Sequence, residues 1–498
     1  MKAPSERTLG ALRASSYRPR TVKNEMRENL LAALKNDVPV FPGIIGYDQT
    51  VIPELVNAIL ARHDFILLGL RGQAKTRILR GLVGLLDPWL PVVAGSEIND
   101  DPFAPVSAMA RRRAAEAGDD LEIAWISREQ RYQEKLATPD VTIADLIGDI
   151  DPVKAATLKL SFSSEDAIHY GLIPRANRGI FAINELPDLQ PRIQVGLLNI
   201  LQENDIQIRG FPVRLPLDLC IVTSANPEDY TNRGAIITPL KDRIDSQILT
   251  HYPRDLDDAR AITDQESWVT RDGVEIHVPD YLRDAVERIA FEARQSEYVD
   301  QASGVSARLP ISALECVVSN LERRAAQTGE ARVVARPGDL QAAVPAITGK
   351  IELVYEGEQE GPLKVARYLI GRAVKSAFEA RLPAVHPKRA KRRGADAPPP
   401  EPASPYRPIM DWFGGGKRLE LDDASSAADH YAKLKAVPEL EAQARAHLGA
   451  TEPALLGPAM EFILEGMHQS SVLAKEETEG RRVFLDMLQT MFSELEEA

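Results

Sequence analysis

The feature that most constrains the fold of this chain is an apolar strand that leads directly into a glycine-containing loop and a helix. Four apolar residues, Phe65–Leu68, predict a strand buried on both faces. The loop after it has the spacing of a phosphate-binding loop and consists of Gly69, Leu70, Arg71, Gly72, Gln73, Ala74, Lys75 and Thr76. Backbone N–H groups at the start of the helix would face phosphates, whose charge the helix dipole favours. We therefore expect Lys75 to reach the β- and γ-phosphates and Thr76 to offer its hydroxyl to Mg²⁺.

One residue of this loop departs from the usual pattern. Ala74 stands where a second glycine is usual, and its Cβ restricts the backbone and crowds the space beside the phosphates. Taken alone, the loop could also be a strand-to-helix turn that carries a surface lysine. The other motifs decide between these two interpretations.

Two further apolar runs end on polar residues. Ile180–Ile183 is followed by Asn184 and Glu185, and Leu219–Val222 leads to Asn226. Ligands of open α/β sheets bind at the carboxyl ends of strands. We expect Glu185 to polarise the attacking water as a general base, and Asn226 to orient that water or contact the γ-phosphate. Asn184 would offer an oxygen near Mg²⁺ without a full charge; the alternative is a strand that simply ends in solvent.

Two arginines follow these strands in the chain. Arg243 is predicted to act across a subunit boundary as an arginine finger, which neutralises charge in phosphoryl transfer. Arg308, at the start of a helix, is a candidate sensor that couples the phosphate state to movement of a lid. A single arginine is ordinarily a surface residue, and only the order of the motifs distinguishes these two.

The alternation of strands and helices predicts an α/β fold with a parallel sheet between helices. The predicted domains are an N-terminal arm and helix (1–40), a nucleotide-binding domain (41–254), a helical lid (255–360), a helix with a proline-rich basic linker (361–405) and a C-terminal helical domain (406–498). The last domain is expected to end in a helix whose apolar stripe begins with Val483, Phe484 and Met487.

Composition narrows the functional classes. The formal net charge of −13 argues against a nucleic-acid partner. The two cysteines, Cys220 and Cys316, show neither metal-ligand spacing nor a disulfide framework, so we expect a reducing, cytoplasmic location. No apolar run is long enough to span a bilayer, and the N-terminus lacks the apolar core of a secretory signal.

The order of these motifs resembles that of AAA+ ATPases, and the finer match is to magnesium-chelatase subunit I and its MoxR relatives. The similar stretches are 41–46, 146–151, 171–180 and a predicted β-hairpin at 205–216 with Gly210 at its tip. The resemblance covers about 42–351. It implies an αβα sandwich followed by an all-α lid. It further implies ATP and Mg²⁺ as cofactors, with an adenine pocket lined by Ile44, Ile45, Gly46 and Tyr47.

The resemblance also implies a homo-oligomeric ring, expected to be a hexamer, and a partner with a von Willebrand factor A domain. Three functions stay open: a motor that remodels a client protein, the ATPase subunit of magnesium chelatase, and a nucleic-acid-translocating motor. Arg209 and Arg214 in the hairpin favour the third, whereas the acidic total charge opposes it. A sigma-54 activator would need a Gly-Ala-Phe-Thr-Gly-Ala loop, which the sequence lacks. The departures at Ala74 and Asn184 predict slow hydrolysis.

Overall fold

The computed structural model describes residues 2–157, 159, 164–208, 214–227, 236–385, 404–478 and 480–487. The chain forms two compact units, Met1–His251 and Tyr252–Ala498, and each is described by itself. We call the first the nucleotide unit, after the nucleotide site that the sequence predicts in it, and the second the helical unit. Among the described residues, no helix combines the length and apolarity that a bilayer span requires.

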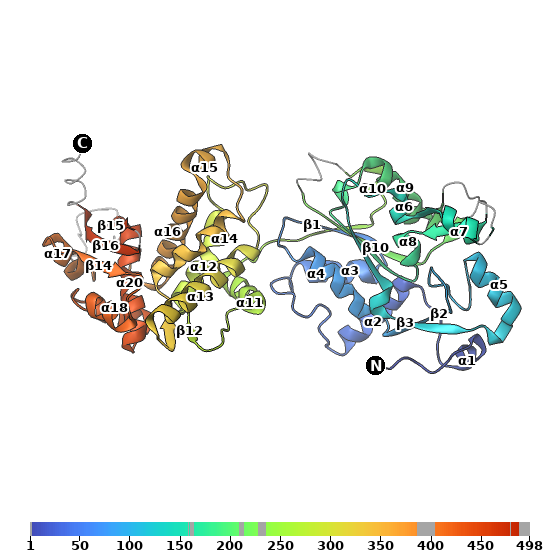
Figure 1. Ribbon diagram of the computed structural model, residues 1–498, viewed down its shortest axis with the longest axis horizontal. Coiled ribbons are helices and arrows are strands. Elements are labelled where there is room, and N and C mark those ends of the chain that lie inside the picture. The colour runs from blue at the N-terminus through green and yellow to red at the C-terminus, as the bar shows by residue number, and fades with distance from the viewer. Residues whose placement is uncertain are drawn as a thin grey trace, which may run out of the picture. The chain divides into compact units, whose positions relative to one another are not determined.

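The nucleotide unit is built around a sheet of five parallel strands (Figure 1). In spatial order these are β11 (Ser246–Leu249), β1 (Phe65–Leu68), β10 (Leu219–Ala225), β7 (Gly179–Asn184) and β4 (Tyr132–Leu136). Every residue of β1, β7 and β10 is buried, because helices cover both faces of the sheet. The predicted parallel sheet and its three apolar strands are confirmed.

Alternate residues of each strand pack into two separate hydrophobic cores, one on each face of the sheet. On one face, Ala182 and Val222 pack with three helices: α2 (Val22–Lys35), α3 (Val51–Leu60) and α4 (Lys75–Gly81). On the other, Phe181 and Ile221 pack with α6 (Ile143–Leu146), α8 (Leu172–Arg175), α9 (Pro191–Glu203) and α10 (Thr238–Lys241). The helix α4 therefore packs on the same face of the sheet as Ala182 and Val222, and its side chains reach the strands from that face.

Smaller elements surround this sheet. They are α1 (Leu9–Ala14), α5 (Ala108–Ala117), α7 (Pro152–Thr157) and three antiparallel pairs: β2 (Trp89–Val93) with β3 (Ile123–Ser127), β5 (Gly148–Ile150) with β6 (Ile168–Tyr170), and β8 (Asp205–Gln207) with β9 (Arg214–Pro216). The last pair confirms the expected hairpin; its tip, with Arg209 and Gly210, lies outside the described residues. The N-terminal helix α2 is anchored by a buried ion pair in which Arg131 donates two hydrogen bonds, of 2.7 and 2.6 Å, to Glu25.

The helical unit combines helices with two small sheets. Its helices are α11 (Leu256–Glu266), α12 (Asp280–Ala293), α13 (Arg308–Thr328), α14 (Val344–Thr348), α15 (Tyr355–Glu360), α16 (Pro362–Arg381), α17 (Arg407–Gly414), α18 (Ala427–Leu434), α19 (Leu440–Leu448) and α20 (Pro453–Gln469). The strands β12 (Glu275–His277) and β13 (Arg332–Val334) pair in parallel. A second, antiparallel sheet has the order β14 (Leu419–Asp422), β16 (Arg481–Asp486), β15 (Leu473–Thr478).

The helical character of the lid and of the C-terminal region is confirmed, but the predicted last helix is wrong for Val483 and Phe484. Both residues lie in β16, the central strand of the antiparallel sheet. Gly480 has a φ of +76° in the turn before β16, a conformation that suits glycine. Pairing with a strand on each side outweighs the helical spacing of the apolar residues.

The lid and the C-terminal region share one hydrophobic core. The ring of Tyr281 on α12 lies 4.6 Å from that of Phe462 on α20, and Phe378 on α16 contacts both Phe462 and Tyr406. Met460 and Met467 are fully buried in the same core, which is ordinary packing. The division of the chain into five domains stays a prediction.

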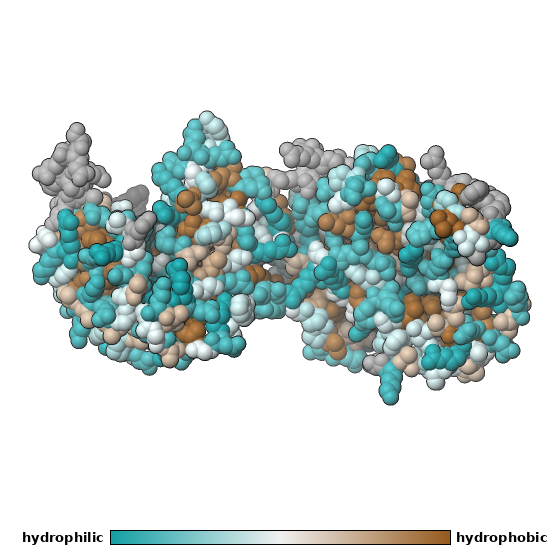
Figure 2. All heavy atoms as spheres, viewed as in Figure 1, coloured by the Kyte–Doolittle hydropathy of each residue, from teal (hydrophilic) through white to brown (hydrophobic). Residues whose placement is uncertain are grey.

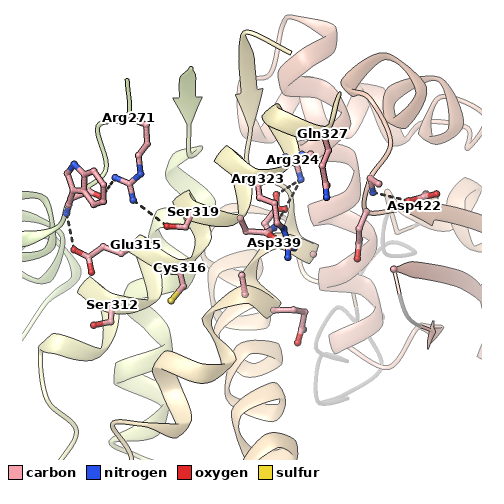
Figure 3. A pocket seen from close by; sticks show the side chains of 18 residues that line it. Arg271, Ser312, Glu315, Cys316, Ser319, Arg323, Arg324, Gln327, Asp339 and Asp422 are labelled. Carbon is pink, nitrogen blue, oxygen red and sulfur yellow. Dashed lines mark hydrogen bonds and ion pairs between the residues drawn. The ribbon is translucent and has the colours of Figure 1, made fainter. Parts of the chain in front are cut away.

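The described part of the helical unit carries a large cleft. Figure 2 shows a mostly hydrophilic face on which hydrophobic residues are scattered. A polar cleft of about 1120 Å³ opens along α13 in the helical unit, and the Arg324–Asp339 ion pair, at 2.6 Å, forms part of its wall (Figure 3). None of the residues predicted to bind nucleotide lines this cleft.

Candidate nucleotide site

The loop between β1 and α4 has a backbone that only certain residues accept. A Cβ on Gly69 would lie 1.8 Å from Oγ1 of Thr250 and 2.1 Å from Oε1 of Gln73, so any other residue here would force these two side chains to move. Ala74, the residue before α4, has a φ of +56°, in the left-handed region. An alanine costs roughly 1 kcal/mol more than glycine in that conformation. The Cβ of Ala74 therefore adds strain and does not prevent the loop from forming.

Lys75 is buried and bends back over its own loop. Its ammonium group donates hydrogen bonds to the carbonyl oxygens of Gly69 and Leu70, the latter at 3.1 Å. It also donates to Oδ1 of Asn226 at 2.8 Å. Phosphate oxygens are acceptors of the same kind and carry a full charge, so they fit the donor that Lys75 presents.

A line of hydrogen bonds connects Lys75 to the end of the neighbouring strands. Asn226 follows β10, and its Nδ2 donates to Oε2 of Glu185 at 3.0 Å. Glu185 follows β7 and has a φ of +54°, so a second non-glycine residue in this site adopts a left-handed conformation. Such strain is concentrated at functional sites. The structure thus brings together the predicted lysine, asparagine and glutamate at the carboxyl ends of β1, β10 and β7.

Asn184, the last residue of β7, is held between two neighbours. Its Oδ1 accepts a hydrogen bond of 3.2 Å from Oγ of Ser224, and its Nδ2 donates to Oε1 of Glu134 at 2.6 Å. Glu134 lies on β4 and also accepts two bonds, of 2.8 and 3.1 Å, from Arg80. Burial, and then the nearby Glu134, raise the pKa of Tyr132 well above its usual range. The sequence interpretation missed Glu134, whose only signal is its place in a short polar edge strand.

The segment expected to form the adenine pocket contacts the phosphate loop through Tyr47. The hydroxyl of Tyr47 lies 2.7 Å from the carbonyl oxygen of His251 and 3.0 Å from that of Gln73, so its single proton is shared between the two acceptors. Its ring stands edge-on to that of His251, with centroids 4.9 Å apart. Ile44, Ile45 and Gly46 precede it in an irregular, half-buried stretch. An adenine-binding role for this stretch stays a prediction.

The remaining predicted residues stand apart from this network. Thr76 is the second residue of α4 and is half-buried. Arg243 donates to Oε1 of Gln202 on α9 at 2.7 and 3.0 Å, and to the carbonyl oxygen of Pro239 at 2.8 Å. Arg308 is exposed at the first residue of α13, in the helical unit. Their predicted roles are therefore not tested by the hydrogen bonds of one protomer.

The residues present fit a nucleoside triphosphate with Mg²⁺. The loop offers backbone donors at a helix N-terminus, Lys75 offers a buried cation, and Thr76 and Asn184 offer neutral oxygens. The described residues contain no group of three His, Cys, Asp or Glu side chains that could hold a metal by themselves. A metal ion at this site would therefore share its ligands with the phosphates of the nucleotide.

Comparison with known proteins gives a consistent set of relatives. A family model for the sigma-54 interaction domain matches residues 157–247. The magnesium-chelatase 38 kDa subunit of Cereibacter sphaeroides is 29% identical over 224 residues, which cover 44% of this chain and 60% of that protein. The magnesium-chelatase subunit ChlI of Euglena gracilis is 27% identical over 214 residues, which cover 41% and 57% respectively. The chain thus spans less than two thirds of the length of these relatives.

Solved structures are similar at lower identity. A model of the complex between subunits BchI and BchD of magnesium chelatase contains a chain that is 20% identical, with a TM-score of only 0.35. The match covers 64% of this chain and 98% of that one. A putative ATPase from Cytophaga hutchinsonii is 16% identical over 70% of this chain and 95% of its own, with a TM-score of 0.28.

Proposed function

Because this chain belongs to the AAA+ ATPases and is related to subunit I of magnesium chelatase, we propose that it binds and hydrolyses Mg·ATP. The site is the carboxyl edge of β1, β10 and β7. The observation that carries the proposal is the chain of hydrogen bonds from Lys75 through Asn226 to Glu185. It joins a phosphate-binding cation to the general base, with a polar amide between them.

In this proposal each residue has one task. Lys75 would neutralise charge on the β- and γ-phosphates. Thr76 and Asn184 would offer oxygens to Mg²⁺ or its bound water, and the ion would supply further positive charge beside the phosphates. Glu185 accepts a proton from the attacking water. Asn226 bonds to both Lys75 and Glu185, so phosphates that draw Lys75 away also change the partner of Glu185. Nucleotide binding and activation of the base are thereby linked through one amide.

The proposal is tested by replacing Lys75 with alanine and measuring Mg·ATP binding by calorimetry. A charge-assisted bond of this kind contributes about 1.5–3 kcal/mol, so the affinity should fall by roughly ten- to a hundredfold. Arg77→Ala is the matched control, because it removes an equal charge from the exposed side of the same helix. Equal affinities for wild type and Lys75→Ala would contradict the assignment of the site.

We further propose that the chain forms a hexameric ring that remodels a client protein together with a von Willebrand factor A-domain partner. Support comes from the family relationship and from Arg243, which bonds to Gln202 on its own protomer and not to the Lys75 network. An arginine finger acts on a phosphate held by a neighbouring subunit. Light scattering with and without Mg·ATP tests the ring.

A narrower candidate is the ATPase subunit of a magnesium chelatase, which the curated relatives favour. This function predicts that ATP hydrolysis rises when a porphyrin and the other chelatase subunits are added. A turnover that these additions leave unchanged would favour the remodelling motor.

A further inference from the structure

We propose that Glu134 is a positioning residue that supplies, through Asn184, the negative charge that an asparagine at this position does not itself carry. The inference rests on the proposed Mg·ATP function and deepens it. It assigns a role to a residue on β4, outside the phosphate loop and the strand ends where the site residues were expected.

The strand register places Glu134 on the correct face of the sheet. The strands β4 and β7 pair in parallel, with Glu134 opposite Ala182 and Leu136 opposite Asn184. Alternate residues of a strand share a face, so Glu134, Ala182 and Asn184 all lie on one side. Ala182 packs in the same core as Ile78 of α4. Glu134 and Asn184 therefore face the helix that carries Thr76.

The hydrogen bond between the two side chains has a defined direction. A carboxylate can only accept, so the 2.6 Å bond requires the amide nitrogen of Asn184 to face Glu134. The amide oxygen is then turned toward Ser224, and it keeps one lone pair for a metal-bound water. An aspartate at position 184 would instead bring two carboxylates within hydrogen-bonding distance. Asn184 with Glu134 thus carries the same total charge as an aspartate beside a neutral residue.

Arg80 connects this pair to the phosphate-loop helix. It lies four residues after Thr76 on α4, hence on the same side of that helix, and its guanidinium bonds to both oxygens of Glu134. The side chain of Arg80 is 65% exposed, whereas that of Glu134 is 20% exposed. Even with two hydrogen bonds, an ion pair with so exposed a partner is screened by solvent and contributes little to stability. A divalent cation near Asn184 can therefore compete with Arg80 for the charge of Glu134.

The alternative is that the Arg80–Glu134 pair only fastens α4 to the edge of the sheet. The two roles make opposite predictions for Arg80. If the pair is only a fastening, removing either partner has the same effect. If Glu134 serves the metal, removing Arg80 leaves the carboxylate in place and frees it from a competing cation.

The test measures how much Mg²⁺ strengthens ATP binding, from calorimetric titrations of ATP in Mg²⁺ and in EDTA. Glu134→Gln should reduce this Mg²⁺-dependent gain about tenfold, while affinity in EDTA stays within about twofold. Arg80→Ala should preserve or increase the gain.

Asn184→Asp alone should not increase the Mg²⁺-dependent gain, because two carboxylates would then compete for one position. The exchange variant, Glu134→Gln with Asn184→Asp, should recover most of the gain. Titration with Mn²⁺, followed by its paramagnetic resonance signal, gives a second reading of metal affinity.

Each result decides between the roles. Equal losses in Glu134→Gln and Arg80→Ala would overturn the inference in favour of a fastening. An unchanged gain in Glu134→Gln, with a clear gain in wild type, would overturn the inference and leave the proposed function standing. If wild type shows no Mg²⁺-dependent ATP binding, the proposed function fails and this inference fails with it. A recovered gain in the exchange variant supports the charge-supplying role, because a fastening would not be restored by Asn184→Asp.

Discussion

Replacing Glu287 with glutamine should remove a pH-dependent loss of folding stability from the helical unit. Glu287 lies on α12, is 3% exposed, and its Oε2 has no hydrogen-bond partner among the described residues. Burial raises the pKa of Glu287 from 4.5 to about 7. Glu287 and Arg294 line one small cavity. The guanidinium of Arg294 donates to the carbonyl oxygen of Val305 and stacks on the ring of Tyr252 at 4.0 Å. The carboxyl group is therefore more easily accommodated as the neutral acid.

The magnitude follows from the pKa of Glu287 in the folded and unfolded chain. Since the folded pKa is the higher one, the contribution of this group is fully present below pH 4.5 and is lost as the pH rises through 7. At about 1.36 kcal/mol per pH unit, the free energy of unfolding should fall by about 2.5 kcal/mol between about pH 5 and pH 8. Glutamine has nearly the same shape and cannot ionise, so Glu287→Gln should lack this loss.

The assay is urea unfolding at each pH, followed by a brief deuterium pulse at one fixed pH and mass spectrometry of peptides from α12 and α16. The pulse reports which fraction of these helices is unfolded, separately from the nucleotide unit. Glu297→Gln is the control, because Glu297 is exposed just after α12. If wild type and Glu287→Gln lose stability in parallel from pH 5 to 8, Glu287 is not the buried acid that we describe.

Two further predictions concern the nucleotide site. Ala74→Gly should relieve the strain of a φ of +56° and stabilise the loop by about 0.5–1 kcal/mol. ATP binding, measured by calorimetry, should then become tighter. Weaker binding would show that the Cβ of Ala74 is not a hindrance. Arg243→Ala should leave nucleotide binding nearly intact and suppress hydrolysis by about tenfold or more. Mixing it with Glu185→Gln subunits should restore part of the ATPase rate, and no recovery would count against a finger that acts across subunits.

The sequence predicts best those strands whose composition is determined by burial on both faces. The strands β1, β7 and β10 are buried on both faces, so their composition is apolar throughout and their polar ends stand out. Glu185 and Asn226 could be named because each directly follows such a strand, and Lys75 because the spacing of the loop after β1 places it at the start of a helix. Their hydrogen bonds to one another could not be predicted, because the spatial order of the strands does not follow the order of the chain.

Failures of the sequence interpretation arise where a distant partner decides the outcome. The helix predicted for Val483 and Phe484 has a plausible apolar spacing, but β14 and β15 pair with this segment from both sides. Glu134 looks like an ordinary polar residue of a half-exposed strand until β7 places Asn184 beside it. In both cases the information lies in residues far away in the sequence.

The shared core of the helical unit has a mechanical consequence. Tyr281, Phe378 and Phe462 interlock helices from both sides of the basic linker, and a close-packed interior is hardly compressible. The strands β14, β15 and β16 contribute Leu421, Leu473 and Phe484 to the same core as α12 and α13. A displacement of these two helices would therefore carry the three strands with it as part of one body.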